Sequence, residues 1–311
     1  MKGKSGAKGL VRIIRYVGLL CMLLPLAAGA AVEIPTVEQL TGITMSKEVL
    51  WGPGRLAIAG DGTLYVVDSY KNHIVKFDRD GNYIGDIPFP RASAIAVAPN
   101  GTLYIGSNVD YSVSIVSNGT VVGQLGGGKN EFRSVRDIAY DSASGLIYVA
   151  DNVGNAVRIF EAAGRDLGSI VGVNLPMGIE VSADAIYVID APAVSVQEGI
   201  ATTSRISIFD KQHKRTGTIN DYGKNQLFIP TDIVAADGIL YLTDAALQSV
   251  VLFDTAGTCL GEIQSTAGPL RTAVSLAMSS EGVLYVSSNE THSIEMFAIT
   301  PGVSVQQGGR Q

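Results

Sequence analysis

The chain has 311 residues, of which 46% are hydrophobic and 17% charged, so it has ample material for a core and is not a disordered, solvating chain. A sequence pI of about 5.1 argues against a nucleic-acid-binding protein. The 2 cysteines are too few for a scaffold held together by disulfides.

The first thirty residues have the layout of a secretory signal peptide. Basic residues and no acidic residue come before an apolar run of 16 residues, Val17 to Val32. The small residues Ala28-Gly29-Ala30 then offer a cleavage site before Ala31. An uncleaved anchor is the alternative, but a membrane-spanning helix needs about 20 apolar residues. We therefore predict a signal peptide over 1–30, a periplasmic or secreted protein, and no transmembrane segment after cleavage.

Cleavage changes the charge of the chain. The mature protein keeps 18 of the 23 basic residues and all 29 acidic residues, which gives a net charge of −11. Such a surface repels nucleic acid and acidic lipid and favours solubility. We expect no nucleic-acid partner and a chain that is monomeric on its own. Only Cys259 is left, so the fold must be stable without an intrachain disulfide.

Six copies of a strand-like block run through the mature chain. Each copy has a central Tyr, and these Tyr residues are separated by 39, 44, 39, 54 and 44 positions. A second apolar block ends 12 residues after the Tyr in five copies and 22 residues after it in the fourth. The central residues are Tyr65, Tyr104, Tyr148, Tyr187, Tyr241 and Tyr285. A repeat of about 40 residues is typical of propellers and solenoids.

Two further strand-like segments complete the repeat. An alternating apolar run such as Ile95-Ala96-Val97 precedes each Tyr, and a Gly-x-Ile or Gly-x-Leu segment follows the second block in the first five copies. Alternating β-branched residues, with Gly, Asn or Asp between the runs, predict short antiparallel strands. The sequence therefore predicts an all-β fold, a six-bladed β-propeller with four-stranded antiparallel blades over residues 31–300. Residues 301–311 are expected to form a flexible tail.

The sixth repeat lacks a fourth strand of its own after Phe297. Thr41-Gly42-Ile43-Thr44 lies ahead of the first repeat at about the distance expected of that missing strand. An N-terminal strand in this place would remove an open sheet edge. We therefore predict that the ring is closed near residues 41–45. The alternative is that residues 31–50 form a linker.

Parts of the repeat resemble the NHL family. The motifs are Gly128-Lys129-Asn130-Glu131-Phe132, Gly223-Lys224-Asn225-Gln226-Leu227, and Asn72-His73-Ile74-Val75-Lys76-Phe77-Asp78. The resemblance covers about residues 50–299 and implies the same six-bladed fold. NHL propellers include binding scaffolds, cytoplasmic RNA readers and secreted lyases, so the resemblance does not choose a function.

The sequence gives little support for catalysis. A catalytic zinc site commonly needs three His ligands, and His73, His213 and His292 lie in unrelated settings. The resemblance to the secreted amidating lyases therefore fails at the residues that would hold zinc. No Gly-x-Ser-x-Gly motif is present, and Cys259 begins an outer strand where nothing activates it. We expect no cofactor. A calcium ion in the central channel is an alternative, because oxygen ligands are plentiful.

Two sets of charged residues recur in the repeat. Four second strands end in Asp, and we expect these residues to accept hydrogen bonds from the following turn; they are Asp68, Asp151, Asp190 and Asp244. The residue before the first-strand Leu or Ile is charged in alternate repeats, as Arg55, Asp137 and Asp232. First strands line a propeller channel, so these three side chains are candidates to converge near its mouth. The alternative is that each is solvated or pairs locally.

The face at the channel mouth is the candidate binding site. The excess residues of repeat four, 191–204, fall in a loop on this face, although a neutral insertion is the alternative. Positive charge is expected to gather there; the basic candidates are Lys129, Arg133, Arg136, Lys224 and Arg271. We therefore predict an exported binding or scaffold module for an envelope or extracellular protein or an anionic glycan. The alternative is a secreted hydrolase or lyase with a calcium-supported channel site.

Overall fold

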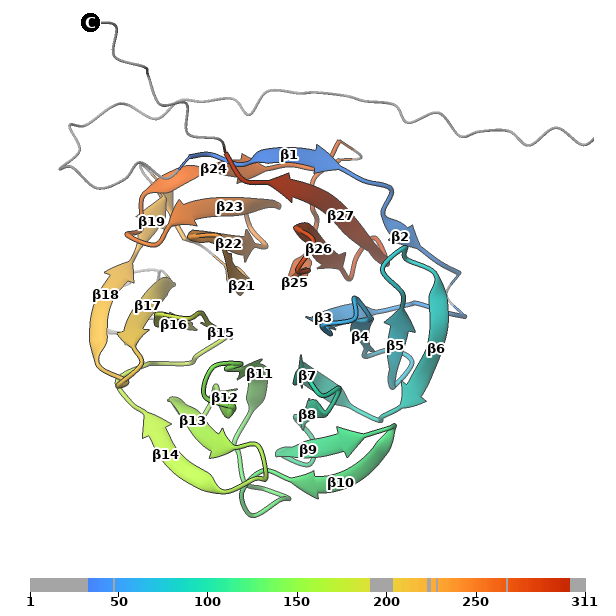
Figure 1. The fold of residues 1–311 in the computed structure, drawn as a ribbon, viewed down its shortest axis with the longest axis vertical. Helices are drawn as coiled ribbons and strands as arrows, with labels where there is room; N and C mark the ends of the chain where they lie inside the picture. The colour runs from blue at the N-terminus through green and yellow to red at the C-terminus, as the bar shows by residue number, and fades with distance from the viewer. Residues whose placement is uncertain are drawn as a thin grey trace, which may run out of the picture.

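The structure, a computed structural model, describes residues 33–46, 48–190, 204–222, 225–227, 229–266 and 268–302. Six small antiparallel sheets stand around a central axis, which makes the protein a six-bladed β-propeller (Figure 1). The predicted fold class is therefore confirmed. The predicted signal peptide, most of the repeat-four loop, Lys224 and the C-terminal tail lie outside the described residues. No helix within the described ranges is long and apolar enough to cross a membrane.

Each blade has four strands in the order of the chain, from the axis outward. The first three blades are β3 (Pro53–Ile58), β4 (Leu64–Asp68), β5 (His73–Phe77) and β6 (Tyr83–Pro88); β7 (Ala92–Val97), β8 (Leu103–Ser107), β9 (Ser112–Ser117) and β10 (Thr120–Gln124); and β11 (Val135–Tyr140), β12 (Leu146–Asp151), β13 (Ala156–Glu161) and β14 (Asp166–Ile170).

The next two blades follow the same plan. They are β15 (Gly178–Val181), β16 (Ala185–Asp190), β17 (Arg205–Asp210) and β18 (Arg215–Ile219); and β21 (Pro230–Ala236), β22 (Ile239–Asp244), β23 (Ser249–Asp254) and β24 (Cys259–Ile263). Between them, β19 (Asp221–Tyr222) and β20 (Asn225–Gln226) pair as a short ribbon. The sixth blade has β25 (Ala273–Met278), β26 (Val283–Ser288) and β27 (Ser293–Thr300).

The sixth blade is closed by strands from the N-terminal side of the chain. β1 (Thr36–Gln39) and β2 (Ile43–Thr44) both pair antiparallel with β27. β2 lies where the sequence predicts the closing strand, but the longer pairing involves β1, which begins upstream of the predicted segment. The first blade is thus tied to the last by main-chain hydrogen bonds, and β27 has no open outer edge along this stretch.

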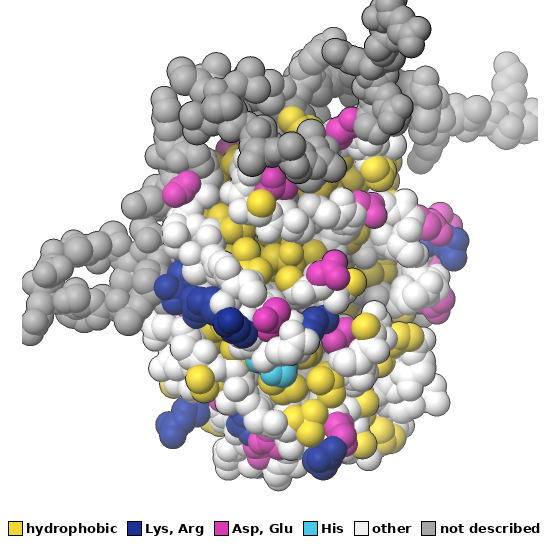
Figure 2. Space-filling model, turned by 60° about the vertical axis from the view of Figure 1, so that its left-hand side comes forward, with side chains coloured by type: hydrophobic (Ala, Val, Ile, Leu, Met, Phe, Trp, Pro, Cys, Tyr) yellow, Lys and Arg dark blue, Asp and Glu magenta, His cyan; other side chains and the backbone are white. Residues whose placement is uncertain are grey.

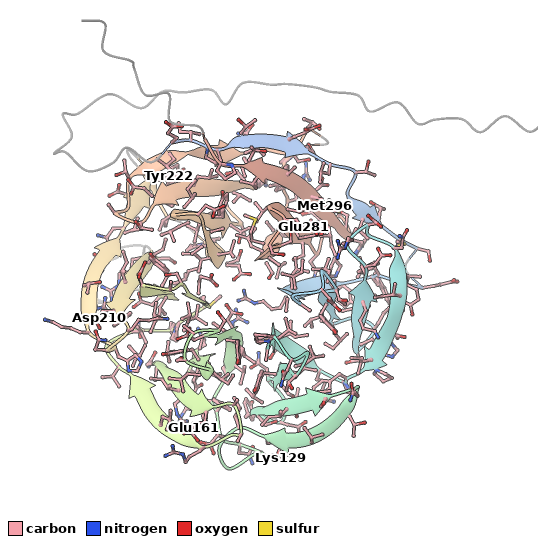
Figure 3. All side chains as sticks on the ribbon, viewed as in Figure 1. Lys129, Glu161, Asp210, Tyr222, Glu281 and Met296 are labelled. Atoms are coloured by element: carbon pink, nitrogen blue, oxygen red, sulfur yellow. The ribbon has the colours of Figure 1, made fainter. Side chains whose placement is uncertain are left out.

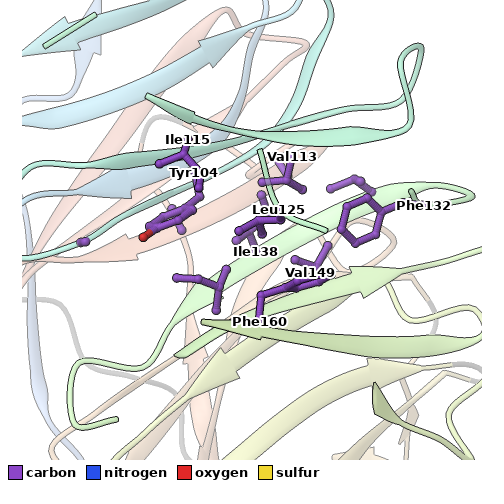
Figure 4. Packing of buried hydrophobic residues seen from close by; sticks show 13 residues of the cluster. Tyr104, Val113, Ile115, Leu125, Phe132, Ile138, Val149 and Phe160 are labelled. Atoms are coloured by element: carbon purple, nitrogen blue, oxygen red, sulfur yellow. The ribbon is translucent and has the colours of Figure 1, made fainter. Parts of the chain in front are cut away.

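The core lies between the blades. Side chains alternate across each strand, so every blade packs one set of apolar residues against each neighbour. Between the second and third blades, Tyr104, Val113, Leu125, Phe132 and Phe160 are buried together (Figure 4). The repeated Tyr belongs to this packing because its ring spans the gap between adjacent blades. The repeat spacing is therefore fixed because each copy must place its Tyr in the same packing position between two blades.

The two faces of the ring carry different connections. One face, the loop face, carries the loops before each first strand and those between the second and third strands. The other face, the turn face, carries the tight turns between first and second strands and between third and fourth strands. The outer strands bend at glycines such as Gly85 (φ 125°) and Gly168 (φ 113°), beside shifts in register. Each side chain can therefore be assigned to a face from its place in the repeat.

Candidate functional site

The structure brings Arg55, Asp137 and Asp232 together in the central channel. Side chains reach toward the axis from the innermost strands (Figure 3), and the Arg55 guanidinium extends from the first blade to the third and fifth. Its Nη1 lies 2.8 Å from Asp232 Oδ1 and 3.6 Å from Asp137 Oδ2. Its Nη2 donates to the carbonyl oxygen of Met177, 2.7 Å away. The three side chains are only 8%, 6% and 5% exposed, so they pair with one another inside the channel.

The two carboxylates also join neighbouring blades. Asp137 Oδ2 accepts a hydrogen bond from the amide of Ile179 at 2.9 Å, and Asp232 Oδ2 accepts one from Leu276 at 2.8 Å. In the same register, Ser275 Oγ accepts from the amide of Leu56 at 3.0 Å. Each acceptor therefore satisfies an amide on the inner edge of the next blade's first strand. This is a structural role, because a first strand has no strand partner on its channel side.

One cation serves more than one carboxylate in this cluster. Burial opposes the charge on Arg55, but Asp137 and Asp232 raise its pKa. Burial raises the pKa of Asp137 to about 7; Arg55 opposes this rise and Asp232 adds to it. Arg55 lies closer to Asp232 than to Asp137, so the Asp137 carboxylate is the less well neutralised of the two. The cluster can therefore take up a proton near neutral pH.

Glu180 forms a second, lower layer of the channel wall. It is on β15, opposite the repeated Tyr187, and its Oε1 accepts a hydrogen bond from the amide of Ala235 at 3.2 Å. Burial raises the pKa of Glu180 to about 7, and the charges of Asp232 and Asp137 add to this effect. The sequence carries a signal for this residue that our sequence analysis missed. The other five blades have an apolar residue in this register, namely Ala57, Ala96, Ala139, Val234 and Ala277.

A cavity of about 330 Å³, which we call the turn-face cavity, opens beside Glu180 between the fifth and sixth blades. Its walls are Glu180, Val234, Ala235, Ala236, Asp237, Tyr241, Met278, Ser279, Ser280, Gly282 and Ile299. Most of these residues belong to the ends of first strands or to the turns that follow them. The cavity is therefore on the face opposite the predicted binding face.

The basic candidates on the loop face have different settings. Lys129 pairs with Asp110 at 3.2 Å, and Arg271 pairs with Glu290 at 3.4 Å. Arg133 and Arg136 are exposed and make no ion pair within the described ranges. The unpaired positive charge therefore lies on fewer residues than the sequence analysis predicts.

Exposed apolar side chains gather on the loop face. Trp51 is 42% exposed and Tyr70 is 55% exposed, and their rings lie 5.4 Å apart. The others on this face are Val109, Tyr111, Val153, Val171, Leu175 and Ile229. They come from loops around the ring and belong to no repeat motif, so sequence reasoning missed them. Figure 2 shows another side of the molecule, where hydrophobic side chains lie among small groups of charges of both signs.

The predicted hydrogen bonds from the following turn are confirmed for Asp68 and Asp244, and all four repeated Asp residues accept bonds from the loop before the first strand. Asp68 accepts from the amides of Tyr70 and Lys71 in the turn that follows, and also from Trp51 and Gly52 in the loop before the first strand. Asp151, Asp190 and Asp244 accept equivalent bonds from that preceding loop. All four are almost fully buried. They position the loop face and are not free to act on a substrate.

The three histidines lie away from the channel. His73 contacts Asp86 across the outer strands of the first blade, and His213 Nε2 lies 3.2 Å from the Tyr148 hydroxyl. His292 is in the loop between the second and third strands of the sixth blade. Within the described ranges, no three His, Cys, Asp or Glu side chains are grouped so as to hold a metal ion.

Comparisons with known proteins identify the fold. No family model matches the chain, and no curated protein matches its sequence. Among solved structures, the chain is similar to a gluconolactonase from Xanthomonas campestris, with a TM-score of 0.61 and 14% identity over 86% of this chain and 98% of that one. It is also similar to virginiamycin B lyase from Staphylococcus aureus, with a TM-score of 0.59 and 12% identity over 85% and 99%.

A third similar structure is hydrazine synthase of Kuenenia stuttgartiensis, with a TM-score of 0.57 and 14% identity over 82% of this chain and 96% of that one. At such low identity these likenesses show a shared fold and nothing finer. The fold occurs in enzymes, so an enzymatic reading is compatible with it. The chain has the six-bladed β-propeller fold of these proteins.

Proposed function

We propose that this protein is an exported binding module whose loop face docks an acidic partner protein. The observation that carries this proposal is that eight of the 14 large exposed apolar side chains of the described residues lie in loop-face connections, with Trp51 and Tyr70 in contact. Isolated exposed apolar residues are ordinary, but several of them in the loops of one face of a rigid scaffold are typical of an interaction surface. Trp and Tyr, both present in this set, are enriched among residues that dominate binding energy.

The charges on this face favour an acidic partner. Arg133 and Arg136 are unpaired, and Arg91 lies nearby in the equivalent loop before β7, also without an ion pair among the described residues. The rest of the mature chain carries a large negative charge, so these side chains form a local positive area. Such an area steers an acidic partner toward the face and raises the association rate at low salt.

We favour a protein over an anionic glycan because aliphatic residues make up much of the exposed set. Val109, Val153, Leu175 and Ile229 offer apolar surface that a protein interface would bury. A glycan would use the aromatic rings and arginines but gain little from these side chains. The distinction is tested by the same experiment as the proposal.

The test is capture of a partner from the envelope of the source organism by the immobilised mature protein. The paired variant Arg133→Ala/Arg136→Ala should lose most of the captured protein, and its binding should depend less on salt. The matched control is Arg79→Ala/Arg165→Ala, two exposed arginines on the turn face. Loss of the partner in the control, or full retention in the first variant, would overturn the assignment of the face. Capture of a polysaccharide alone would replace the protein partner with a glycan.

The alternative is a secreted hydrolase or lyase with a calcium-supported site in the channel. The observation in its favour is that similar folds occur in a gluconolactonase and a lyase, and Glu180 offers an acid group in the channel wall with a pKa of about 7. Stoichiometric calcium in the purified protein, measured by elemental analysis, would favour this alternative. A stable partner on the loop face would favour the binding module.

A further inference from the structure

The turn-face cavity has one strongly polar wall and several apolar ones. Glu180 stands on its channel side, with one carboxylate oxygen held by the amide of Ala235. The backbone amide of Val181 also favours the ionised carboxylate. Val234, Met278 and Ile299 supply apolar walls. An acid group is thus held by backbone amides beside a space that has both polar and apolar walls.

The remaining polar groups at the cavity suit a ligand that donates hydrogen bonds. Tyr241 contributes a hydroxyl with no hydrogen-bond partner among the described residues, and Ser280 contributes another. Asp237 adds a second carboxylate at the rim. The lining contains no Lys, Arg or His. A negatively charged ligand would meet only carboxylates and hydroxyls here, so the charge of the site selects a cation.

The donor set favours an organic cation over a metal ion. The described residues hold no group of three His, Cys, Asp or Glu placed to ligate a metal. A cavity of about 330 Å³ is at the lower end of the range for small-molecule sites, which bury apolar parts against apolar walls. An ammonium group can pair with a carboxylate while a short hydrocarbon body fills such a space.

We propose that the turn-face cavity binds a small protonated amine with a short apolar body, whose ammonium group pairs with Glu180. The apolar body contacts Val234, Met278 and Ile299, and the Tyr241 hydroxyl accepts a second N–H from the ammonium. This site is on the face opposite the proposed protein-binding surface and does not depend on that proposal. Neither result decides the other.

The charged groups that face Glu180 determine how this binding depends on pH. Asp137 on β11 and Asp232 on β21 disfavour the ionised carboxylate, whereas the Ala235 amide favours it. Arg55 pairs with those two aspartates in the layer above. Glu180 ionises as the pH rises through neutrality, so affinity for an amine should increase from about pH 5.5 to about pH 8.

The test uses mature protein with 13C-labelled methionine methyl groups and three probes of similar size. Benzylammonium should shift the Met278 methyl signal, because Met278 lines the cavity, and leave Met177 on the loop face unshifted. Benzyl alcohol should bind at least tenfold more weakly, and benzoate should not bind. These differences isolate the positive charge from the apolar body.

Two variants separate the charge from the cavity. Glu180→Gln should weaken benzylammonium binding at least tenfold and remove the preference over benzyl alcohol. Ala236→Leu keeps every charge but fills part of the space, and it should weaken both probes. Glu161→Gln, at an exposed carboxylate on the same face paired with Arg165, is the control and should bind as the wild type does.

Three results would overturn the proposal. The first is equal affinity for benzylammonium and benzyl alcohol in the wild type. The second is unchanged benzylammonium binding in Glu180→Gln with a folded spectrum. The third is a Met278 shift on adding Ca²⁺ but none on adding benzylammonium, which would make the site a metal site.

Discussion

The two layers of the channel wall treat buried carboxylates in opposite ways. In the upper layer, Asp137 and Asp232 surround Arg55 and are held by amides of the next blades. In the lower layer, Glu180 has backbone amide donors, no cation among the described residues, and the turn-face cavity at its side. The two layers are two registers of the repeat, which lie two residues apart along the first strands.

The difference indicates that Asp137 and Asp232 have a structural role, whereas Glu180 can react with a proton or a ligand. The buried ion pair of the upper layer mainly specifies how the blades fit together. The half-buried Glu180, without a cation among the described residues, has a raised pKa and can bind a proton or a ligand.

The largest effect is expected from removing the strands that keep the ring closed. Deleting residues 31–48 removes β1 and β2 and exposes the edge of β27. The midpoint of thermal unfolding should fall by on the order of 10 °C, and the protein should aggregate more readily. Differential scanning calorimetry and light scattering measure both quantities. A deletion variant as stable as its parent would mean that these strands add nothing to closure.

Breaking the upper layer should have the next largest effect. Arg55→Met leaves Asp137 and Asp232 buried without their cation, which should cost about 3–5 kcal/mol in the free energy of unfolding. Chemical denaturation measures this loss. The variant Arg55→Met/Asp137→Asn/Asp232→Asn removes the unpaired charges and should recover most of the stability. If the triple variant is no more stable than Arg55→Met, unpaired charge is not the cause.

The lower layer predicts a pH-dependent change in stability. The pKa of Glu180 is about 7 in the folded protein, above its value in the unfolded chain, so the folded state holds more protons between about pH 4 and 7. Its contribution to stability therefore falls as the pH rises through this window. Relative to the wild type, Glu180→Gln should gain on the order of 2 kcal/mol between about pH 5.5 and pH 8.5. A constant difference between the two proteins would show that Glu180 titrates at an ordinary pKa.

The smallest effect on stability is expected on the loop face. Arg133→Ala/Arg136→Ala removes two exposed side chains without ion pairs, so the free energy of unfolding should change by no more than about 0.5 kcal/mol. Urea denaturation at neutral pH measures this change. A larger loss would mean that these arginines hold the loop in place, and loss of partner binding in this variant would then say nothing about recognition.

Much of the fold could be predicted from the sequence because the repeat is local. The spacing from each Tyr to its second block reflects strand and turn lengths, and these are set within one blade. The position of β1 was missed because Thr36–Gln39 is short, polar and half-exposed, and pairs only with the far end of the chain.

The candidate site was predictable only in part. Arg55, Asp137 and Asp232 stand out because they break a register that is small or polar elsewhere, and the ring brings that register together. Their mutual pairing depends on distances across the channel, which no sequence spacing encodes. The cavity beside Glu180 depends on the shapes of two blades more than fifty residues away along the chain. The exposed apolar set arises from irregular loops, where a repeat template gives no expectation.

The titration of the Glu180 carboxyl, followed by 13C NMR with the Glu180→Gln variant for assignment, tests the difference between the two layers most directly. We predict a midpoint near pH 7 in the free protein. Saturating benzylammonium should move this midpoint to lower pH, because the bound cation stabilises the carboxylate. A midpoint near the ordinary Glu value of about 4.3, unchanged by the amine, would contradict the account.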